Sequence, residues 1–211
     1  MSEPRQARLA EPLLQAPFAL GAAVVVYAWD QGAGLAALAV MTVVWPPAVG
    51  WRPMRPAGVA AVYVPFAFVW LALTICYLQA MHTFGVAIAP QPMLEQLAQQ
   101  GLDMPSAGLV IASIVVLWPV VEEVLFRGYL WTAFDRVLPR VWTHVVSSAL
   151  FGLMHGLEYA LPIAVLALVF SWLRARHQSL LAPILAHALH NGLTVALTLL
   201  WPGHLDLLYP R

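Results

Sequence analysis

The feature that most constrains this sequence is an apolar run over residues 107–134 that contains three ionisable side chains, Glu122, Glu123 and Arg127. The run is long enough to cross a bilayer as a helix. Each ionised side chain at the centre of a membrane helix costs ~2.5 to 3.5 kcal/mol, so three unpaired ones would cost about 7 to 10 kcal/mol. The fold must therefore supply partners for these groups in apolar surroundings.

The composition indicates that the whole chain belongs in a membrane. Of its 211 residues, 62% are hydrophobic and 9% are charged, and the mean hydropathy of +0.79 lies far above the range of soluble globular domains. The net charge is zero, and no basic cluster suggests binding to nucleic acid. We therefore expect an all-α, polytopic helical bundle that contacts the lipid bilayer, encloses a polar intramembrane site and binds no nucleic acid.

Seven apolar runs follow one another along the chain, and each is expected to form a membrane helix. Several are shorter than the ~20 residues that span a typical hydrocarbon core. The first two form either a hairpin that turns at residues 30–34 or one long, kinked span. The runs cover residues 18–29, 35–49, 59–81, 107–134, 141–157, 161–173 and 180–201.

The positions of the arginine residues favour the hairpin, because short cytoplasmic loops collect arginine and translocated loops do not. A single first span would move Arg5 and Arg8 away from the other arginines. We therefore predict about seven transmembrane helices, with the N-terminus inside and the C-terminus outside. The cytoplasmic side then holds four pairs of basic residues: Arg5/Arg8, Arg52/Arg55, Arg136/Arg140 and Arg174/Arg176.

The segments between the runs complete the predicted architecture. Residues 1–17 are charged and read as a short cytosolic lead-in, with no removed signal peptide. In residues 90–103, Met93, Leu94 and Leu97 line one side of a short helix, which lies either at the outer membrane interface or in solvent. We divide one compact membrane domain into residues 1–106, with N-terminal helices and this interfacial segment, and residues 107–201, with the candidate catalytic core.

Helix geometry separates the two adjacent glutamates. Residues four apart project ~40° from each other, so Glu123 and Arg127 share a face and are expected to pair. Glu122 is turned ~100° from Glu123 and ~140° from Arg127. A carboxylate in a low dielectric without a close cation has its pKa raised toward the range of a general base. The sequence therefore predicts a structural pair and a second carboxylate suited to activating water.

Two later runs bring further polar groups to membrane depth. One contains Phe151 and His155, and the other contains His187 and Asn191, which are four apart and share a face. Lipid offers these groups no partners, so we expect them to converge on Glu122 in a shared cavity. A carboxylate, an imidazole beside it and a His/Asn pair that donates to an oxyanion would form a hydrolytic site. The alternative for a histidine such as His190 taken alone is helix packing.

The three ordered motifs resemble those of the CPBP family, the intramembrane proteases related to type II CAAX prenyl endopeptidases and bacterial Abi proteins. They are the pair Glu122-Glu123 followed by Arg127, then Phe151 with His155, then His187 with Asn191. The resemblance covers roughly residues 109–197. The chain contains no HExxH, no Gly-x-Gly-Asp and no Gly-x-Ser of the kinds that mark other intramembrane protease classes.

The resemblance implies a role for each motif residue. Glu122 would be the general base that activates water, with His155 helping to hold that water. Glu123 and Arg127 would support the site, and His187 with Asn191 would stabilise the tetrahedral oxyanion. Members of the family are often labelled metalloproteases, and a carboxylate with two histidines is a plausible zinc set. The glutamate mechanism needs no metal, so we favour a glutamic protease without a cofactor over a zinc-dependent one.

The resemblance also implies a class of substrate, and two other functions remain as alternatives. It implies a membrane-protein or peptide substrate, either a CAAX-like tail or, as in the bacterial myxosortase type, a C-terminal membrane anchor. The expected location is the bacterial cytoplasmic (inner) membrane. The alternatives are a catalytically silent Abi or immunity-type membrane protein and an ion transporter. The latter would need discontinuous helices or inverted repeats, and the sequence has neither.

Overall fold

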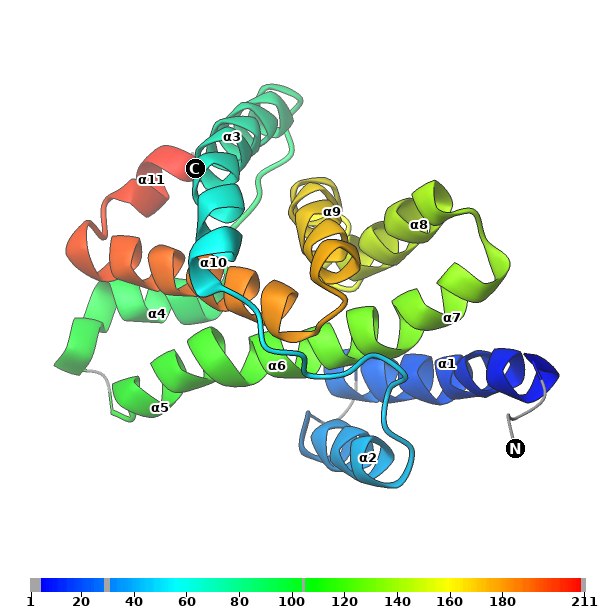
Figure 1. The fold of residues 1–211 in the computed structure, drawn as a ribbon. Coiled ribbons are helices and arrows are strands. Elements are labelled where there is room, and N and C mark those ends of the chain that lie inside the picture. The colour runs from blue at the N-terminus through cyan, green and yellow to red at the C-terminus, as the bar shows by residue number, and fades with distance from the viewer. Residues whose placement is uncertain (1–4, 29–30, 104, 210–211) are drawn as a thin grey trace. The chain divides into compact units, whose positions relative to one another are not determined.

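A computed structural model describes residues 5–28, 31–103 and 105–209, and within these ranges the chain contains helices and no β-strand. The predicted all-α class is therefore confirmed. Figure 1 shows the helices in chain order. They are α1 (Arg5–Ala28), α2 (Gln31–Val44), α3 (Pro56–Thr83), α4 (Pro92–Gln100), α5 (Ala107–Ala112), α6 (Trp118–Glu123), α7 (Trp131–Val137), α8 (Arg140–Leu153), α9 (Ala160–His177), α10 (Leu181–Leu200) and α11 (His204–Leu208).

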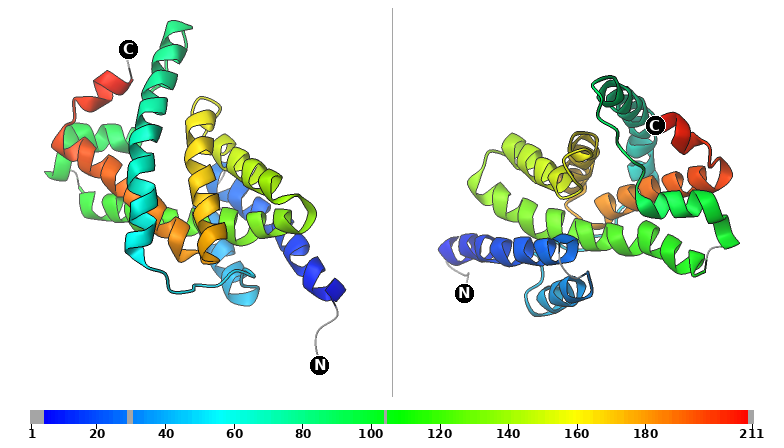
Figure 2. Two further views of the ribbon diagram at one scale, coloured as in Figure 1. Left: turned by 45° about the horizontal axis from the view of Figure 1, so that its top comes forward. Right: turned by 180° about the vertical axis from the view of Figure 1, so that it is seen from behind.

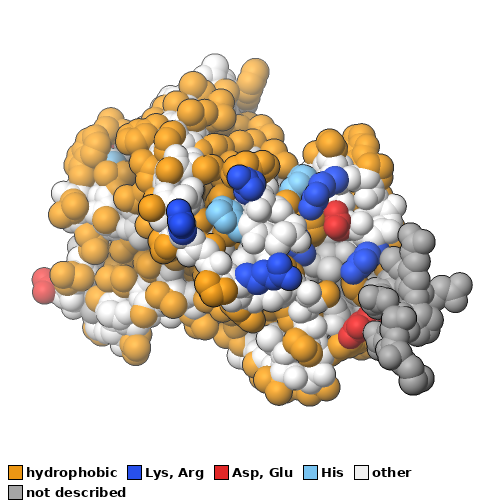
Figure 3. All heavy atoms as spheres, in the orientation of Figure 1, with side chains coloured by type: hydrophobic (Ala, Val, Ile, Leu, Met, Phe, Trp, Pro, Cys, Tyr) orange, Lys and Arg blue, Asp and Glu red, His pale blue; other side chains and the backbone are white. Residues whose placement is uncertain are grey.

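Among the described residues, four helical segments are long and apolar enough to cross a membrane, and the chain is an integral membrane protein. They are Pro56–Thr83, Ala107–Val137, Ala160–His177 and Leu181–Leu200. The helices α2 and α8 have 14 residues each and are ~21 Å long, less than a typical hydrocarbon core of ~30 Å. The predicted number of seven spans is not confirmed. Hydrophobic side chains cover much of the face shown in Figure 3.

The chain divides into two compact units, each made of two segments. The first comprises Met1–Arg55 and Val120–Ile184, and the second comprises Pro56–Pro119 and Leu185–Arg211. The predicted division between residues 106 and 107 stays a prediction.

The N-terminal part of the first unit is a helical hairpin. Gln15 in the middle of α1 donates from Nε2 to the carbonyls of Trp45 (3.3 Å) and Pro46 (3.2 Å), directly after α2. Trp45 Nε1 in turn donates to Glu11 Oε1 at 2.8 Å. The paired residues lie at similar numbers of positions before and after the connection between α1 and α2, as in two antiparallel helices. The hairpin is thus the correct alternative. Its first helix begins at Arg5, inside the expected lead-in. The predicted turn over residues 30–34 is too long: residue 30 lies outside the described ranges, and residues 31–34 already form the start of α2.

This hairpin packs against the helix that carries the acidic motif. The Tyr129 hydroxyl donates to the carbonyl of Trp45 at 3.0 Å. A Cβ on Gly128 would lie 3.2 Å from Cβ of Pro47 and 3.5 Å from Cδ1 of Leu180, so the absence of a side chain allows this close approach. The N-terminal segment is therefore joined to the acidic motif within one unit.

The helices α8 and α9 form a second close pair in the first unit, and Figure 2 shows them side by side. Ser148 and Ser171 hydroxyls lie 3.2 Å apart across the interface. A Cβ on Gly152 would collide with the carbonyl oxygen of Ala160 and would lie 3.0 Å from Cβ of Ala164. Small residues let membrane helices approach closely, and Gly152 is the residue here that no larger one can replace without movement.

In the second unit, the short helix α4 packs against other helices of the same unit. Leu94 and Leu97 are buried together with Val195, and Val110 and Leu199 pack against this cluster. Met93 remains exposed. The protein itself therefore buries two of the three apolar residues that were expected to face an interface or solvent.

The close approach at Gly152 gives a testable prediction. We expect Gly152→Ala to lower the free energy of unfolding by about 1–3 kcal/mol, because the added methyl group meets a backbone carbonyl. Thermal unfolding in detergent micelles measures this change. The matched control is Gly21→Ala in α1, where a Cβ meets nothing within 4 Å and helix propensity favours alanine by ~0.5–1 kcal/mol. Equal effects of the two substitutions would contradict the packing of α8 on α9.

Candidate active site

The acidic motif lies where an α-helix changes to a π-helix. Glu122 and Glu123 end α6, and the π-helical turn η3 follows over Val124–Leu130. Two backbone carbonyls of this turn also accept hydrogen bonds from side chains of other helices. The carbonyl of Phe126 accepts from Ser147 Oγ at 3.5 Å and that of Arg127 accepts from Arg174 Nε at 3.3 Å. Such turns are frequent at functional sites.

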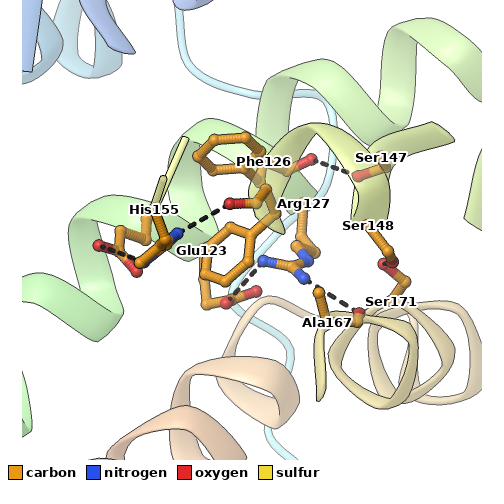
Figure 4. Close-up of polar contacts among 10 residues, drawn as sticks. Glu123, Phe126, Arg127, Ser147, Ser148, His155, Ala167 and Ser171 are labelled. Atoms are coloured by element: carbon orange, nitrogen blue, oxygen red, sulfur yellow. Dashed lines mark hydrogen bonds and ion pairs between the residues drawn. The ribbon is translucent and has the colours of Figure 1, made fainter. Parts of the chain in front are cut away.

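Glu123 and Arg127 form the ion pair that their spacing predicts. Arg127 Nη1 lies 2.9 Å from Glu123 Oε1, and both side chains are fully buried. Arg127 Nη2 donates to the carbonyl of Ala167 at 3.0 Å, and the guanidinium carbon lies 4.4 Å from the ring centroid of Phe151. Figure 4 shows the arginine with its two hydrogen-bond partners, Glu123 and Ala167. The pair therefore joins the acidic motif to α8 and α9.

The imidazole of His155 lies beside Glu122 in the first unit. His155 Nε2 is 3.9 Å from Glu122 Oε1, and the side chains of His155 and Glu122 are 18% and 8% exposed. His155 was expected within the helix, but α8 ends at Leu153 and His155 lies in the turn that follows. Gly156 continues this turn at φ +98°, a conformation that favours glycine. The turn directs His155 back toward the acidic motif.

The hydrogen bond at Nδ1 of His155 determines whether Nε2 of the same ring is a donor or an acceptor. Nδ1 lies 2.8 Å from the carbonyl oxygen of Phe151. A carbonyl only accepts, so Nδ1 carries the hydrogen, and in the neutral ring Nε2 is an acceptor. A water oxygen ~2.8 Å from both Nε2 and the Glu122 carboxylate would donate to each at an angle of about 90°. The geometry therefore suits a water held between the two groups.

Two side chains of the site in the first unit, Glu122 and His155, are of the kinds that bind zinc. Catalytic zinc takes three protein ligands. Glu122 and His155 supply two donors near each other, but no group of three or more His, Cys, Asp or Glu side chains suited to a metal occurs in the described part of the chain.

His187 and Asn191 lie on α10, in the part that belongs to the second unit. His187 is buried. Asn191 donates from Nδ2 to the carbonyl of Ile114 at 2.8 Å, within the π-helical turn η2 (Ser113–Leu117). Their convergence on Glu122 stays a prediction.

Arg174 is a buried residue whose position the sequence did not suggest. It was expected to mark a cytoplasmic loop, but its side chain is only 5% exposed. Its guanidinium carbon lies 3.8 Å from the ring centroid of Trp131, and Nη2 donates to Thr132 Oγ1 at 3.1 Å. Together with its bond to the Arg127 carbonyl, Arg174 holds η3 and the start of α7. The only hint in the sequence was an arginine that follows an apolar run directly.

Comparison with known proteins supports the resemblance drawn from the motifs. Residues 105–193, which contain all six candidate site residues, match the family described as type II CAAX prenyl endopeptidase Rce1-like. The chain is also similar to the Bacillus subtilis protein named "Putative membrane peptidase YdiL", with 29% identity over 92 residues. That match covers 43% of this chain and 37% of the relative, so the chain spans little more than a third of the relative's length. No solved structure matches the chain.

The buried ion pair yields a prediction on stability. We expect Arg127→Met to reduce the free energy of unfolding by about 3–5 kcal/mol, because it leaves the Glu123 carboxylate in an apolar interior without its cation. The double variant Glu123→Leu/Arg127→Met should recover part of this loss. Chemical unfolding in mixed micelles measures both. Arg176→Met, on an exposed arginine of α9, should change stability by less than about 0.5 kcal/mol; a similar loss there would refute a special role for Arg127.

Proposed function

Because residues 105–193 match the family of type II CAAX prenyl endopeptidase Rce1-like proteins, we propose that the protein is an intramembrane endopeptidase. It hydrolyses a peptide bond of a membrane-associated substrate. The observation that carries the proposal is the pair of Glu122 and His155, 3.9 Å apart and both partly shielded from solvent. Two hydrogen-bond acceptors at this separation suit a bound water, and water is the second substrate of peptide hydrolysis.

In the proposed reaction, Glu122 is the general base. Its carboxylate removes a proton from the water while the water oxygen attacks the carbonyl carbon of the substrate. The C–N bond of the tetrahedral intermediate then breaks, and the proton held by Glu122 passes to the leaving amine. His155 orients the water through Nε2, because its Nδ1 hydrogen is already donated to the carbonyl of Phe151. The ion pair of Glu123 and Arg127 keeps η3 in place.

We assign the stabilisation of the oxyanion to His187 and Asn191. An amide side chain has two N–H donors. One N–H of Asn191 is bound by the carbonyl of Ile114, which orients the amide plane and leaves the second N–H for the substrate oxygen. Donors that are oriented before the reaction stabilise the charge that develops in the transition state.

The proposed substrates are membrane proteins or membrane-bound peptides. Four apolar helical segments in the described part of the chain are long enough to span a bilayer, so a substrate reaches the site from the membrane or its surface. Two classes are proposed, a prenylated CAAX-like peptide and a protein with a C-terminal membrane anchor. The relative from Bacillus subtilis is named "Putative membrane peptidase YdiL", and we propose a location in the bacterial cytoplasmic membrane.

The central test is Glu122→Gln, which keeps the size of the side chain and removes its basicity. We expect cleavage to fall at least ~100-fold, because a general base commonly contributes 10²- to 10⁴-fold. The assay uses purified protein with two probes, a farnesylated CAAX peptide carrying a fluorophore and quencher, and a protein with a C-terminal membrane anchor. Asp103→Asn, on an exposed carboxylate, is the matched control. Full cleavage of either probe by Glu122→Gln would remove Glu122 from its assigned role.

A second test concerns the metal. We expect cleavage to be unchanged after dialysis against a strong chelator such as 1,10-phenanthroline, because the proposed base is a carboxylate and the described residues hold no three-ligand set. Cleavage rates before and after chelation, and after adding zinc, measure this. Loss of activity that zinc restores would overturn the metal-free mechanism in favour of the zinc-dependent one.

A further inference from the structure

A polar contact in the second unit lies next to the His187–Asn191 motif and has no part in the proposed reaction. The hydroxyl of Tyr63, on α3, lies 2.7 Å from Nδ1 of His190 on α10, and Tyr63 is 1% exposed. Trp70, on the same helix, meets the same imidazole edge to face, with ring centroids 4.5 Å apart. Residues seven apart lie on one helix face, so one face of α3 holds His190 through two rings.

The next residue holds α10 from another direction. Asn191 donates to the carbonyl of Ile114 in η2. Successive residues of a helix project ~100° apart. The contacts of His190 and Asn191 therefore act on different sides of α10 and together resist its rotation about its own axis.

The side chain of His187 lies in the sector between these two contacts. His187 precedes His190 by three residues, which places it ~60° away around the helix, and precedes Asn191 by four, which places it ~40° away on the other side. Any rotation of α10 that breaks either contact turns His187 by the same angle. The two contacts thus bracket the direction in which His187 projects.

We propose that Tyr63 and His190 are positioning residues of the endopeptidase. Their hydrogen bond sets the rotation of α10 and, through it, the directions of the His187 and Asn191 side chains. The proposal rests on the proposed function, because it assigns these two residues to support the oxyanion site. At membrane depth lipid offers a hydroxyl and an imidazole no partner, so the bond between them persists and defines one arrangement of α3 and α10.

The test begins with Tyr63→Phe, which removes only the hydroxyl. We expect kcat to fall ~10- to 100-fold with little change in KM, because a displaced oxyanion donor acts on the transition state and not on substrate binding. The probes are the farnesylated CAAX peptide and the anchored protein described above. Thr74→Val is the matched control, since it removes a buried hydroxyl of α3 that has no hydrogen-bond partner among the described residues. Its kcat should equal that of the wild type.

Variants of His190 separate positioning from packing. His190→Gln keeps an oxygen that accepts from the Tyr63 hydroxyl and should retain most of kcat, whereas His190→Leu should not. The double variant Tyr63→Phe/His190→Leu should be no slower than His190→Leu, because both changes break the same bond. Losses of kcat that multiply in the double variant would overturn the proposal. A wild-type kcat in Tyr63→Phe, with only a lower unfolding temperature, would also overturn it.

A second readout needs no substrate. In a Cys76→Ser background, His187→Cys reports the direction of this position through its rate of labelling by a water-soluble thiol reagent. We expect Tyr63→Phe to change this rate by more than ~3-fold, because thiol reactivity follows exposure, and Thr74→Val to leave it unchanged. Equal rates with and without Tyr63→Phe would refute the positioning role. Full activity of Glu122→Gln would instead refute the proposed function, so the two failures are distinguishable.

Discussion

The fold of the first unit depends on one requirement, that charged groups in an apolar interior have partners. The buried pair of Glu123 and Arg127 meets it directly. Arg127 also binds the carbonyl of Ala167 on α9 and lies against the ring of Phe151 on α8. Because one side chain contacts three helical elements, the pair fixes how they pack. A buried ion pair contributes little net stability, but a buried charge that loses its partner is costly. Helix packings that separate Glu123 from Arg127 are therefore disfavoured.

The same requirement accounts for the interrupted helix around the acidic motif. A regular α-helix uses its carbonyls internally, whereas the π-helical turns η2 and η3 offer some to side chains. Arg174 and Ser147 occupy carbonyls of η3, and Asn191 occupies the carbonyl of Ile114 in η2. Both π-helical turns are thus hydrogen-bonded to side chains of other helices. In the second unit such a carbonyl holds the motif residue Asn191, and in the first unit such carbonyls bind Ser147 and Arg174, which lie outside the motifs.

Local patterns predicted the features that depend on neighbours in the chain. The all-helical class and the Glu123–Arg127 pair followed from hydropathy and a four-residue spacing, because both are set within a few turns of one helix. Short apolar runs were harder to interpret, because length alone does not separate a span from a buried helix. The runs around α2 and α8 were expected to be spans, but both helices are shorter than a span. Leu94 and Leu97 lie between the apolar runs, and they are buried by residues distant in the chain.

By itself the sequence determined that the chain belongs in a membrane, that its carboxylates need partners, and that its motifs resemble those of one protease family. Only the tertiary structure decided which nitrogen of His155 carries the hydrogen, because that depends on a turn formed by Gly156 and on the carbonyl of Phe151. It also decided that Arg174 is buried against Trp131 and that His190 binds Tyr63. The contacts of Arg174 and His190 join residues more than 40 positions apart. Helical periodicity carries no information about partners on other helices.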